Sequence, residues 1–155
     1  MKKRIKKITL LITLIVMVCS FGLAQTEGKY TFDKSDWKQF EEQNGVLFSQ
    51  KVVEYHDDVN DQHKEYYLVR VTNTTEEDMQ IHAKRTLWYD GKCFNCDSDA
   101  EEYMLDFKIE AGEELVGDPV KRLNDHLVIF KKFLKYRDIA EVTKFEFDKL
   151  TVKIR

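Results

Sequence analysis

Apolar and polar residues alternate over much of the chain, which is the pattern of half-buried β-strands. The clearest example covers residues 103–110, where Tyr103, Leu105, Phe107 and Ile109 occupy every second position. Turn-forming residues separate this stretch from others that are rich in β-branched and aromatic side chains. The pattern predicts seven strands, at residues 46–55, 65–72, 79–89, 103–110, 115–117, 127–134 and 145–154.

The last of these stretches changes face part of the way along. Phe145 and Phe147 occupy odd positions, whereas the apolar residues from Leu150 onward occupy even positions. A strand can keep both sets on one side of a sheet only if its register slips by one residue. We therefore expect a β-bulge or a tight turn near residues 148–149.

Two segments fit helical spacing instead. Residues 35–45 begin with candidate capping residues, place Trp37 and Phe40 on one face and end at Gly45, so we expect a short helix there. In residues 123–136, the apolar positions fit a strand from 127 onward but also the three-to-four-residue spacing of a helix, and both alternatives stay open.

Sequential antiparallel strands with one face in water favour a two-sheet sandwich. The Cys and Trp spacing of antibody domains is missing, so we expect an immunoglobulin-like fold only in the loose architectural sense. The prediction is a mostly β, antiparallel β-sandwich over residues 46–155, preceded by an N-terminal segment, residues 25–45, that carries the short helix.

The first 24 residues have the layout of a secretory signal peptide. A basic head precedes an apolar run from residue 8 to residue 18, and small residues lead to a cleavage site between Ala24 and Gln25. The apolar run is too short for the ~20 residues that span a bilayer, which argues against a retained anchor. A lipoprotein leader processed at Cys19 is disfavoured because the residue before it is not small. We predict a periplasmic or secreted protein of a Gram-negative envelope, with no stable membrane span after cleavage.

Cleavage would also change the charge. The chain has 25 Lys and Arg residues and 28 Asp and Glu residues, and the leader holds five of the basic residues and none of the acidic ones. The remainder would carry a net charge of −8, with 20 basic residues against 28 acidic ones. Because phosphate recognition needs a basic face, we exclude nucleic acid as a partner.

Cys93 and Cys96 form the one motif that stands out. Haem attachment would need a His after the second Cys, where Asp97 stands, and a zinc site would need a second pair of ligands. A thioredoxin-like pair would need a following helix to lower the thiol pKa, but acidic residues follow this pair. In an oxidising compartment the pair is expected to form a small local disulfide, with periplasmic metal handling or thiol-redox chemistry as the alternative.

Two polar stretches hold potential cation ligands. Residues 97–102 are acidic but lack the spacing of a calcium-binding loop, and we expect a solvated loop. Residues 56–63 contain His56, His63 and three Asp residues that could gather a metal, yet connectors between strands are commonly this polar. We therefore predict no metal site and no cofactor. His82 lies on the strand face opposite its apolar neighbours and is expected to face solvent.

The chain lacks a Gly-rich phosphate loop, a GxSxG motif and any spacing that supports a catalytic triad. We predict no catalytic residue and a protein that is not an enzyme. Because loops carry most of the function of sandwich folds, residues 56–64 and 90–102 are the candidate binding regions for a protein or glycan partner.

Three segments, Asn44–Phe48, Leu87–Cys93 and Lys144–Val152, together give the chain a family resemblance. It resembles uncharacterised small exported proteins of Bacteroidota, and the Ala-Gln at the predicted cleavage site is similar to the leaders of exported proteins in that lineage. The resemblance implies a Gram-negative cell envelope and a β-sandwich. It implies no activity and transfers no catalytic or binding residue.

Overall fold

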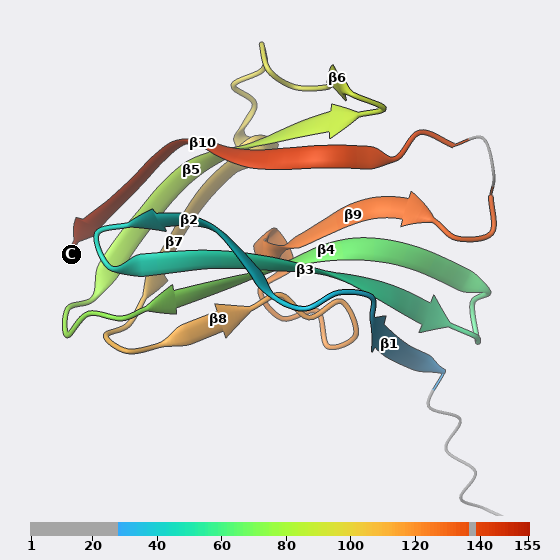
Figure 1. The fold of residues 1–155 in the computed structure, drawn as a ribbon, viewed down its shortest axis with the longest axis horizontal. Helices are drawn as coiled ribbons and strands as arrows, with labels where there is room; N and C mark the ends of the chain where they lie inside the picture. The colour runs from blue at the N-terminus through green and yellow to red at the C-terminus, as the bar shows by residue number, and fades with distance from the viewer. Residues whose placement is uncertain (1–27, 137–138) are drawn as a thin grey trace, which may run out of the picture.

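The computed structural model describes residues 28–136 and 139–155. The predicted signal peptide and its cleavage site lie outside these residues. The described chain folds into two antiparallel sheets that face one another (Figure 1). Ten strands and two short 3₁₀ turns make up the regular structure of this part of the chain.

The larger sheet is built on one long hairpin. Strands β3 (Val46–Asp57) and β4 (Gln62–Asn73) pair along their whole length, from Val46 opposite Asn73 to Asp57 opposite Gln62. The other strands of this sheet lie outside the hairpin: β1 (Lys29–Asp33) and β2 (Lys38–Gln43) along β3, and β8 (Glu114–Val116) and β9 (Val128–Phe133) along β4.

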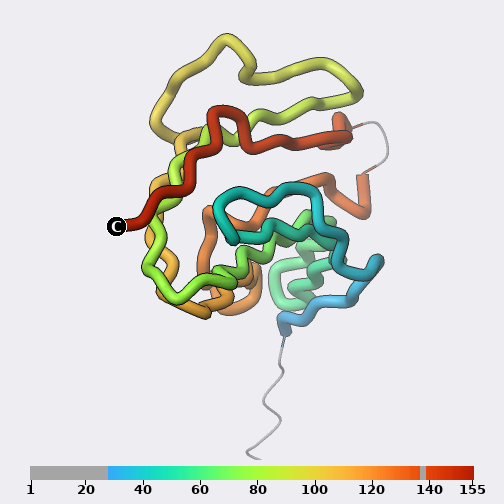
Figure 2. The backbone as a smooth tube through the Cα atoms, turned by 60° about the vertical axis from the view of Figure 1, so that its left-hand side comes forward, coloured from blue at the N-terminus to red at the C-terminus, as the bar shows by residue number. Residues whose placement is uncertain are grey.

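The smaller sheet is centred on β5 (Met79–Tyr89). β10 (Val142–Ile154) pairs with one edge of β5, and β7 (Met104–Ile109) and β6 (Lys92–Cys93) pair with its other edge. Residues 90–102, which contain β6, leave the body of the molecule at its upper end (Figure 2).

The core lies between the two sheets. Phe48, Val69 and Val71 from the larger sheet and Ile81 and Ile109 from the smaller one are almost completely buried. These residues have the alternating positions that predicted the strands, and burial of such side chains is the main force that holds the sheets together. The predicted antiparallel β-sandwich is confirmed, and each of the seven predicted stretches contains a strand.

The predicted slip in the last strand is confirmed. The pairing of β10 with β5 shifts between Asp148 and Thr151, and Lys149 adopts a positive φ of 53°. The extra residue turns Val152 inward, on the side where Phe145 is also buried.

The predicted helix at residues 35–45 is wrong, because residues 38–43 form β2. Asn44 and Gly45 have positive φ values of 50° and 76°, which make the two-residue turn of a hairpin rather than a helix end. The turn brings β2 onto the open edge of β3, and Phe40 packs against the core. Residues 29–43 therefore belong to the sandwich.

The open question at residues 123–136 is also answered. A 3₁₀ turn at Asp125–Leu127 leads into β9, so the segment is mainly a strand. Within the described residues, no helix has the length and apolar character needed to cross a membrane.

Candidate functional site

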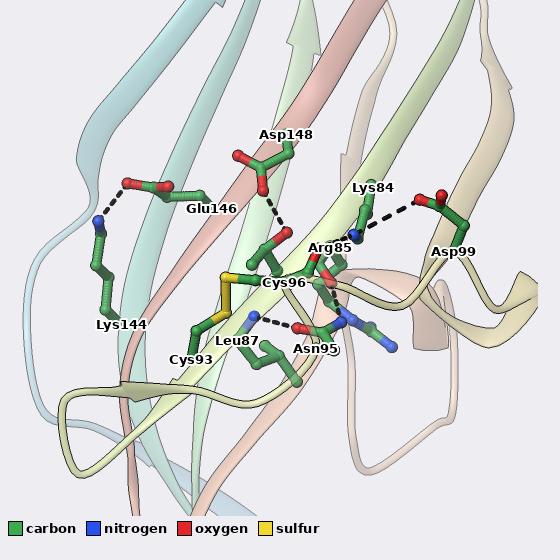
Figure 3. Close-up of a disulfide and its surroundings, with 11 residues drawn as sticks. Lys84, Arg85, Leu87, Cys93, Asn95, Cys96, Asp99, Lys144, Glu146 and Asp148 are labelled. Atoms are coloured by element: carbon green, nitrogen blue, oxygen red, sulfur yellow. Dashed lines mark hydrogen bonds and ion pairs between the residues drawn. A yellow bond between two sulfur atoms is a disulfide. The ribbon is translucent and has the colours of Figure 1, made fainter.

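The candidate binding region at residues 90–102, here called the disulfide loop, begins with a tight turn. Asp90 and Gly91 have positive φ values of 49° and 77° and connect β5 to β6. Cys93 and Cys96 then form the expected disulfide, with their Cα atoms 5.8 Å apart (Figure 3). Neither cysteine precedes an α-helix, and both are exposed.

Asn95, between the two cysteines, fixes the loop to the smaller sheet. Its side chain is buried, with 2% of its surface exposed. Its Oδ1 accepts a hydrogen bond from the backbone N–H of Leu87 at 2.8 Å, and its Nδ2 donates to the backbone carbonyl of Arg85 at 2.8 Å (Figure 3). These two groups of β5 lie between the end of its pairing with β7 and the start of its pairing with β6. The amide of Asn95 therefore replaces a missing strand.

Lysines from the smaller sheet hold the acidic part of the loop. Lys84 is buried and donates to the backbone carbonyl of Cys96 at 2.7 Å, and its Nζ lies 3.6 Å from Asp99 (Figure 3). Lys149 lies 3.2 Å from the same carboxylate. The hydrogen bond and charge of Lys149, followed by the charge of Lys84, lower the pKa of Asp99 below its usual value. The carboxylate is therefore paired with two lysines, and residues 97–102 are mostly exposed, as predicted for a solvated loop.

Phe94 is the exposed tip of the disulfide loop. Its side chain is 62% exposed although it sits between two bonded cysteines. Its ring meets Tyr89 edge to face at 5.3 Å and Tyr103 at 6.4 Å between ring centroids. We call these three rings the aromatic surface. Its central ring is exposed on a loop that is closed by the disulfide and hydrogen-bonded to β5 through Asn95.

The second candidate region, at residues 56–64, is the connection of the β3–β4 hairpin. Asp57 accepts hydrogen bonds from the backbone and the side chain of Asn60, at 3.2 and 2.9 Å, which closes the turn. The side-chain bond from Asn60 is the main reason that the pKa of Asp57 lies below its usual value. The polar connector is shorter than predicted and covers residues 58–61, because residues 56–57 end β3 and residues 62–63 begin β4.

The hairpin brings His56 and His63 opposite one another. Their Nδ1 atoms are 2.8 Å apart. The Nε2 of His56 lies 3.4 Å from a carboxylate oxygen of Glu54, and the Nε2 of His63 lies 3.5 Å from Asp61. Tyr30 of β1 stacks on the His56 ring at 5.1 Å, nearly parallel to it. We call these five residues the histidine cluster.

The remaining histidines are separate. His82 is exposed and lies 3.3 Å from Asp106, which confirms that it faces solvent. His126 packs on the ring of Phe107 at 4.6 Å. In the part of the chain that the structure describes, no group of three or more His, Cys, Asp or Glu side chains is arranged to hold a metal ion.

Sequence reasoning missed Asn95 and the pairing of the two histidines. A signal existed for the second, since a hairpin with a four-residue connection at 58–61 places residues 56 and 63 directly across from each other. No comparable signal existed for Asn95, because the gap that it fills depends on where β7 and β6 stop.

Comparison with known proteins adds no relative. No protein-family model matches the chain, and no curated protein or solved structure matches it significantly.

Proposed function

We propose that the protein is an exported binding module that contacts a protein or glycan partner through the aromatic surface of the disulfide loop. One observation carries the proposal: Phe94 is 62% exposed on a loop fixed by a disulfide and by the buried Asn95. An exposed aromatic ring that is already ordered loses little entropy on binding, which is why such rings are frequent anchors at interfaces.

The surrounding charge supports a partner of this kind. The residues that follow the second cysteine are acidic, and Asp97 beside it is exposed. An apolar tip with a polar, charged rim is the usual composition of a non-obligate interface. The acidic rim disfavours polyanionic partners.

Site-specific photocrosslinking tests the contact. A benzophenone amino acid is placed at position 94, and at position 154 as a matched control, because Ile154 is 67% exposed at the far end of β10. After irradiation of intact cells of the source organism, we expect a discrete adduct in the envelope fraction from position 94 and none from position 154. In parallel, binding of the wild type and Phe94→Ala to an array of cell-surface glycans identifies a glycan partner. Equal adducts from both positions, or no adduct and no glycan binding, would contradict the proposal.

Export is tested separately. Residues 1–24 are fused to a phosphatase that folds only after it leaves the cytoplasm, because its disulfides need an oxidising compartment. We expect phosphatase activity from this fusion and none when the apolar run is interrupted by two Asp residues. An inactive fusion would contradict the envelope location.

A further inference from the structure

We propose that the outer face of the larger sheet carries a binding site for a small amphiphilic anion, an apolar chain that ends in one carboxylate. The site is a cavity of about 480 Å³ between β1, the β3–β4 hairpin and residues 116–123. It lies on the larger sheet, whereas the disulfide loop belongs to the smaller one, so the inference goes beyond the proposed function.

The floor of the cavity comes from the central hairpin. Lys51 of β3 and Leu68 of β4 lie opposite one another in the register. Each is three positions from a core residue of its own strand, Phe48 in β3 and Val71 in β4. Because successive strand residues point to opposite faces, Lys51 and Leu68 lie on the outer face of the sheet. Leu68 is nevertheless only 6% exposed, so another part of the chain covers the outer face at this point.

That cover is the connection after β8, residues 117–123, which lies beside β1 (Figure 1). Asp118 and Leu123 exchange two backbone hydrogen bonds, at 2.9 and 3.2 Å, which close this connection into a loop. The side chain of Asn124 then donates to the backbone carbonyl of Val116 at 3.0 Å. One wall of the cavity is therefore held by hydrogen bonds before a ligand arrives, which reduces the entropy lost on binding.

The lining of the cavity suits an apolar ligand body. Leu68 lies at the floor, and the wall after β8 adds four further apolar side chains: Val116, Pro119, Val120 and Leu123. Leu123 is 54% exposed, an unusual position for a large apolar side chain that has nothing to contact. The volume lies within the range of roughly 300 to 1,000 Å³ that is typical of small-molecule sites.

The charges in the lining favour an anion. Lys29, Lys51 and Lys121 line the cavity, and Asp118 is the one acidic residue among the lining residues. The carboxylate of Asp118 already accepts hydrogen bonds from the backbone N–H groups of Val120 and Lys121, at 2.8 and 3.0 Å. The lining therefore combines an apolar surface with an excess of positive charge, which is complementary to an apolar molecule with one negative group.

Two of the three lysines are placed to contact the carboxylate of a ligand. Lys121 is exposed, and Asp118 bonds its backbone rather than its ammonium group. The Nζ of Lys29 is 3.5 Å from Asp57, but Asn60 is the main partner of that carboxylate, and the Lys29 side chain is 41% exposed. Lys51, by contrast, is 16% exposed and already lies in an ion pair of 2.7 Å.

Nuclear magnetic resonance titration of the isotope-labelled full chain with decanoate, below its micelle concentration, tests the site. Saturable shift changes are expected at the backbone N–H groups of residues 117–123 and none in the disulfide loop. Decanol is the matched uncharged probe and should bind about two- to fivefold more weakly, the value of an exposed ion pair. From hexanoate to decanoate, each added methylene group should strengthen binding by up to about fourfold, because the cavity buries it.

Substitutions separate the charged part of the site from the apolar part. Lys29→Ala and Lys121→Ala should each weaken decanoate binding by about two- to fivefold and leave the affinity for decanol unchanged. Lys153→Ala, on the smaller sheet, is their control. Leu123→Asp should weaken binding of both probes by about tenfold or more, whereas Ile154→Asp, at a position that is 67% exposed, should change neither.

Near-ultraviolet circular dichroism checks that each variant keeps its fold, and the lysine variants test the site even where Leu123→Asp does not fold. Equal affinities of the wild type for decanoate and decanol would overturn the proposal. So would shift changes confined to residues outside the cavity, or no saturable binding of either probe. An affinity that falls as the protein concentration rises would assign the cavity to a second copy of the chain and would also overturn it.

Discussion

At the scale of single residues, the side chain of Asn95 makes backbone hydrogen bonds that a neighbouring strand would otherwise make. It supplies both a donor and an acceptor to the backbone of β5, at Leu87 and Arg85, in a stretch that neither β6 nor β7 covers. Buried backbone groups without a partner are rare because each loses its hydrogen bond to water. The side chain of Asn95 therefore anchors the loop to β5, in addition to the disulfide that closes it.

Asn95→Ala is expected to lower the free energy of unfolding by about 1–3 kcal/mol for each group left unpaired. The double variant Cys93→Ser with Cys96→Ser should lose about 2 kcal/mol, since closing so short a loop removes little chain entropy. Asp97→Ala, an exposed neighbour, is the control and should change stability by less than about 0.5 kcal/mol. Urea denaturation measures all three, and an Asn95→Ala protein as stable as Asp97→Ala would contradict the role assigned to the amide.

His126 links stability to pH at the same scale. Burial, and then the charge of Arg85, lower its pKa below the ordinary value of 6.5, and its Nε2 is buried without a hydrogen-bond partner among the described residues. Because the folded state favours the neutral ring, the stability that depends on it is fully present above the unfolded pKa. It is lost as the pH falls below 6.5 and through the lower pKa of the folded state.

His126→Leu should remove this part of the pH dependence, since Leu keeps the apolar contact with Phe107 and carries no titratable group. Denaturation midpoints at about pH 7.5 and about pH 5.5 measure it. The difference between the two midpoints should shrink in His126→Leu and persist in His82→Leu, whose ring is exposed. Equal shrinkage in both variants would refute the assignment to His126.

At the scale of elements, the bulge in β10 depends on the backbone of Lys149. A positive φ of 53° costs a residue with a Cβ atom roughly 1 to 2 kcal/mol, whereas glycine tolerates it. Lys149→Gly and Lys149→Ala both lose the ion pair with Asp99, so they differ in this backbone strain and in the larger chain entropy that Gly loses on folding. We expect the Gly variant to be the more stable by about 1 kcal/mol.

The same pair of substitutions at Lys153 is the control. Lys153 is exposed in the regular part of β10, opposite Gln80. There the order should reverse, with Ala more stable than Gly by about 0.5 to 1 kcal/mol. Thermal denaturation of the four variants measures both differences, and the same order at both positions would show that the bulge is not strained at Lys149.

The bulge was predictable from sequence, whereas β2 was not. The change from odd to even apolar positions after Phe147 is a local signal that survives in any two-sheet fold. In residues 35–45, the spacing of Trp37 and Phe40 fits a helix as well as a strand. The segment forms a strand because it pairs with the free edge of β3. The Asn44–Gly45 pair was the available clue, because this dipeptide favours hairpin turns.

The candidate functional features depend on tertiary contacts even more than the strands do. Cys93 and Cys96 are close in sequence, so their disulfide could be predicted from spacing and compartment. The surroundings of Phe94 depend on residues outside the Cys93–Cys96 motif, such as Tyr103 of the 3₁₀ turn before β7. No local pattern holds that information.

At the scale of the whole molecule, an aromatic cluster joins the two sheets. Phe40 and Phe48 from the larger sheet pack edge to face against Phe145 and Phe147 from β10, with ring centroids 5.5 Å apart for Phe40–Phe145 and 5.9 Å apart for Phe48–Phe147. Tyr67 of β4 lies 5.4 Å from Phe145. Such contacts across the sheets make each sheet dependent on the other, so the molecule should unfold as one unit.

The two tryptophans allow this to be tested, because they report on different sheets. Trp37 lies under the Arg70 side chain of β4, 4.6 Å from its guanidinium, and Trp88 belongs to β5. The single-tryptophan proteins are Trp37→Phe and Trp88→Phe. In each of them, the denaturation midpoint from fluorescence should equal the midpoint from circular dichroism of the same variant. Phe145→Ala should lower the free energy of unfolding by about 3–5 kcal/mol and shift both fluorescence transitions together. Phe32→Ala, at an exposed position of β1, should shift neither by a comparable amount. Separate transitions for the two tryptophans in the Phe145→Ala background would mean that the sheets fold independently and that the aromatic cluster does not join them.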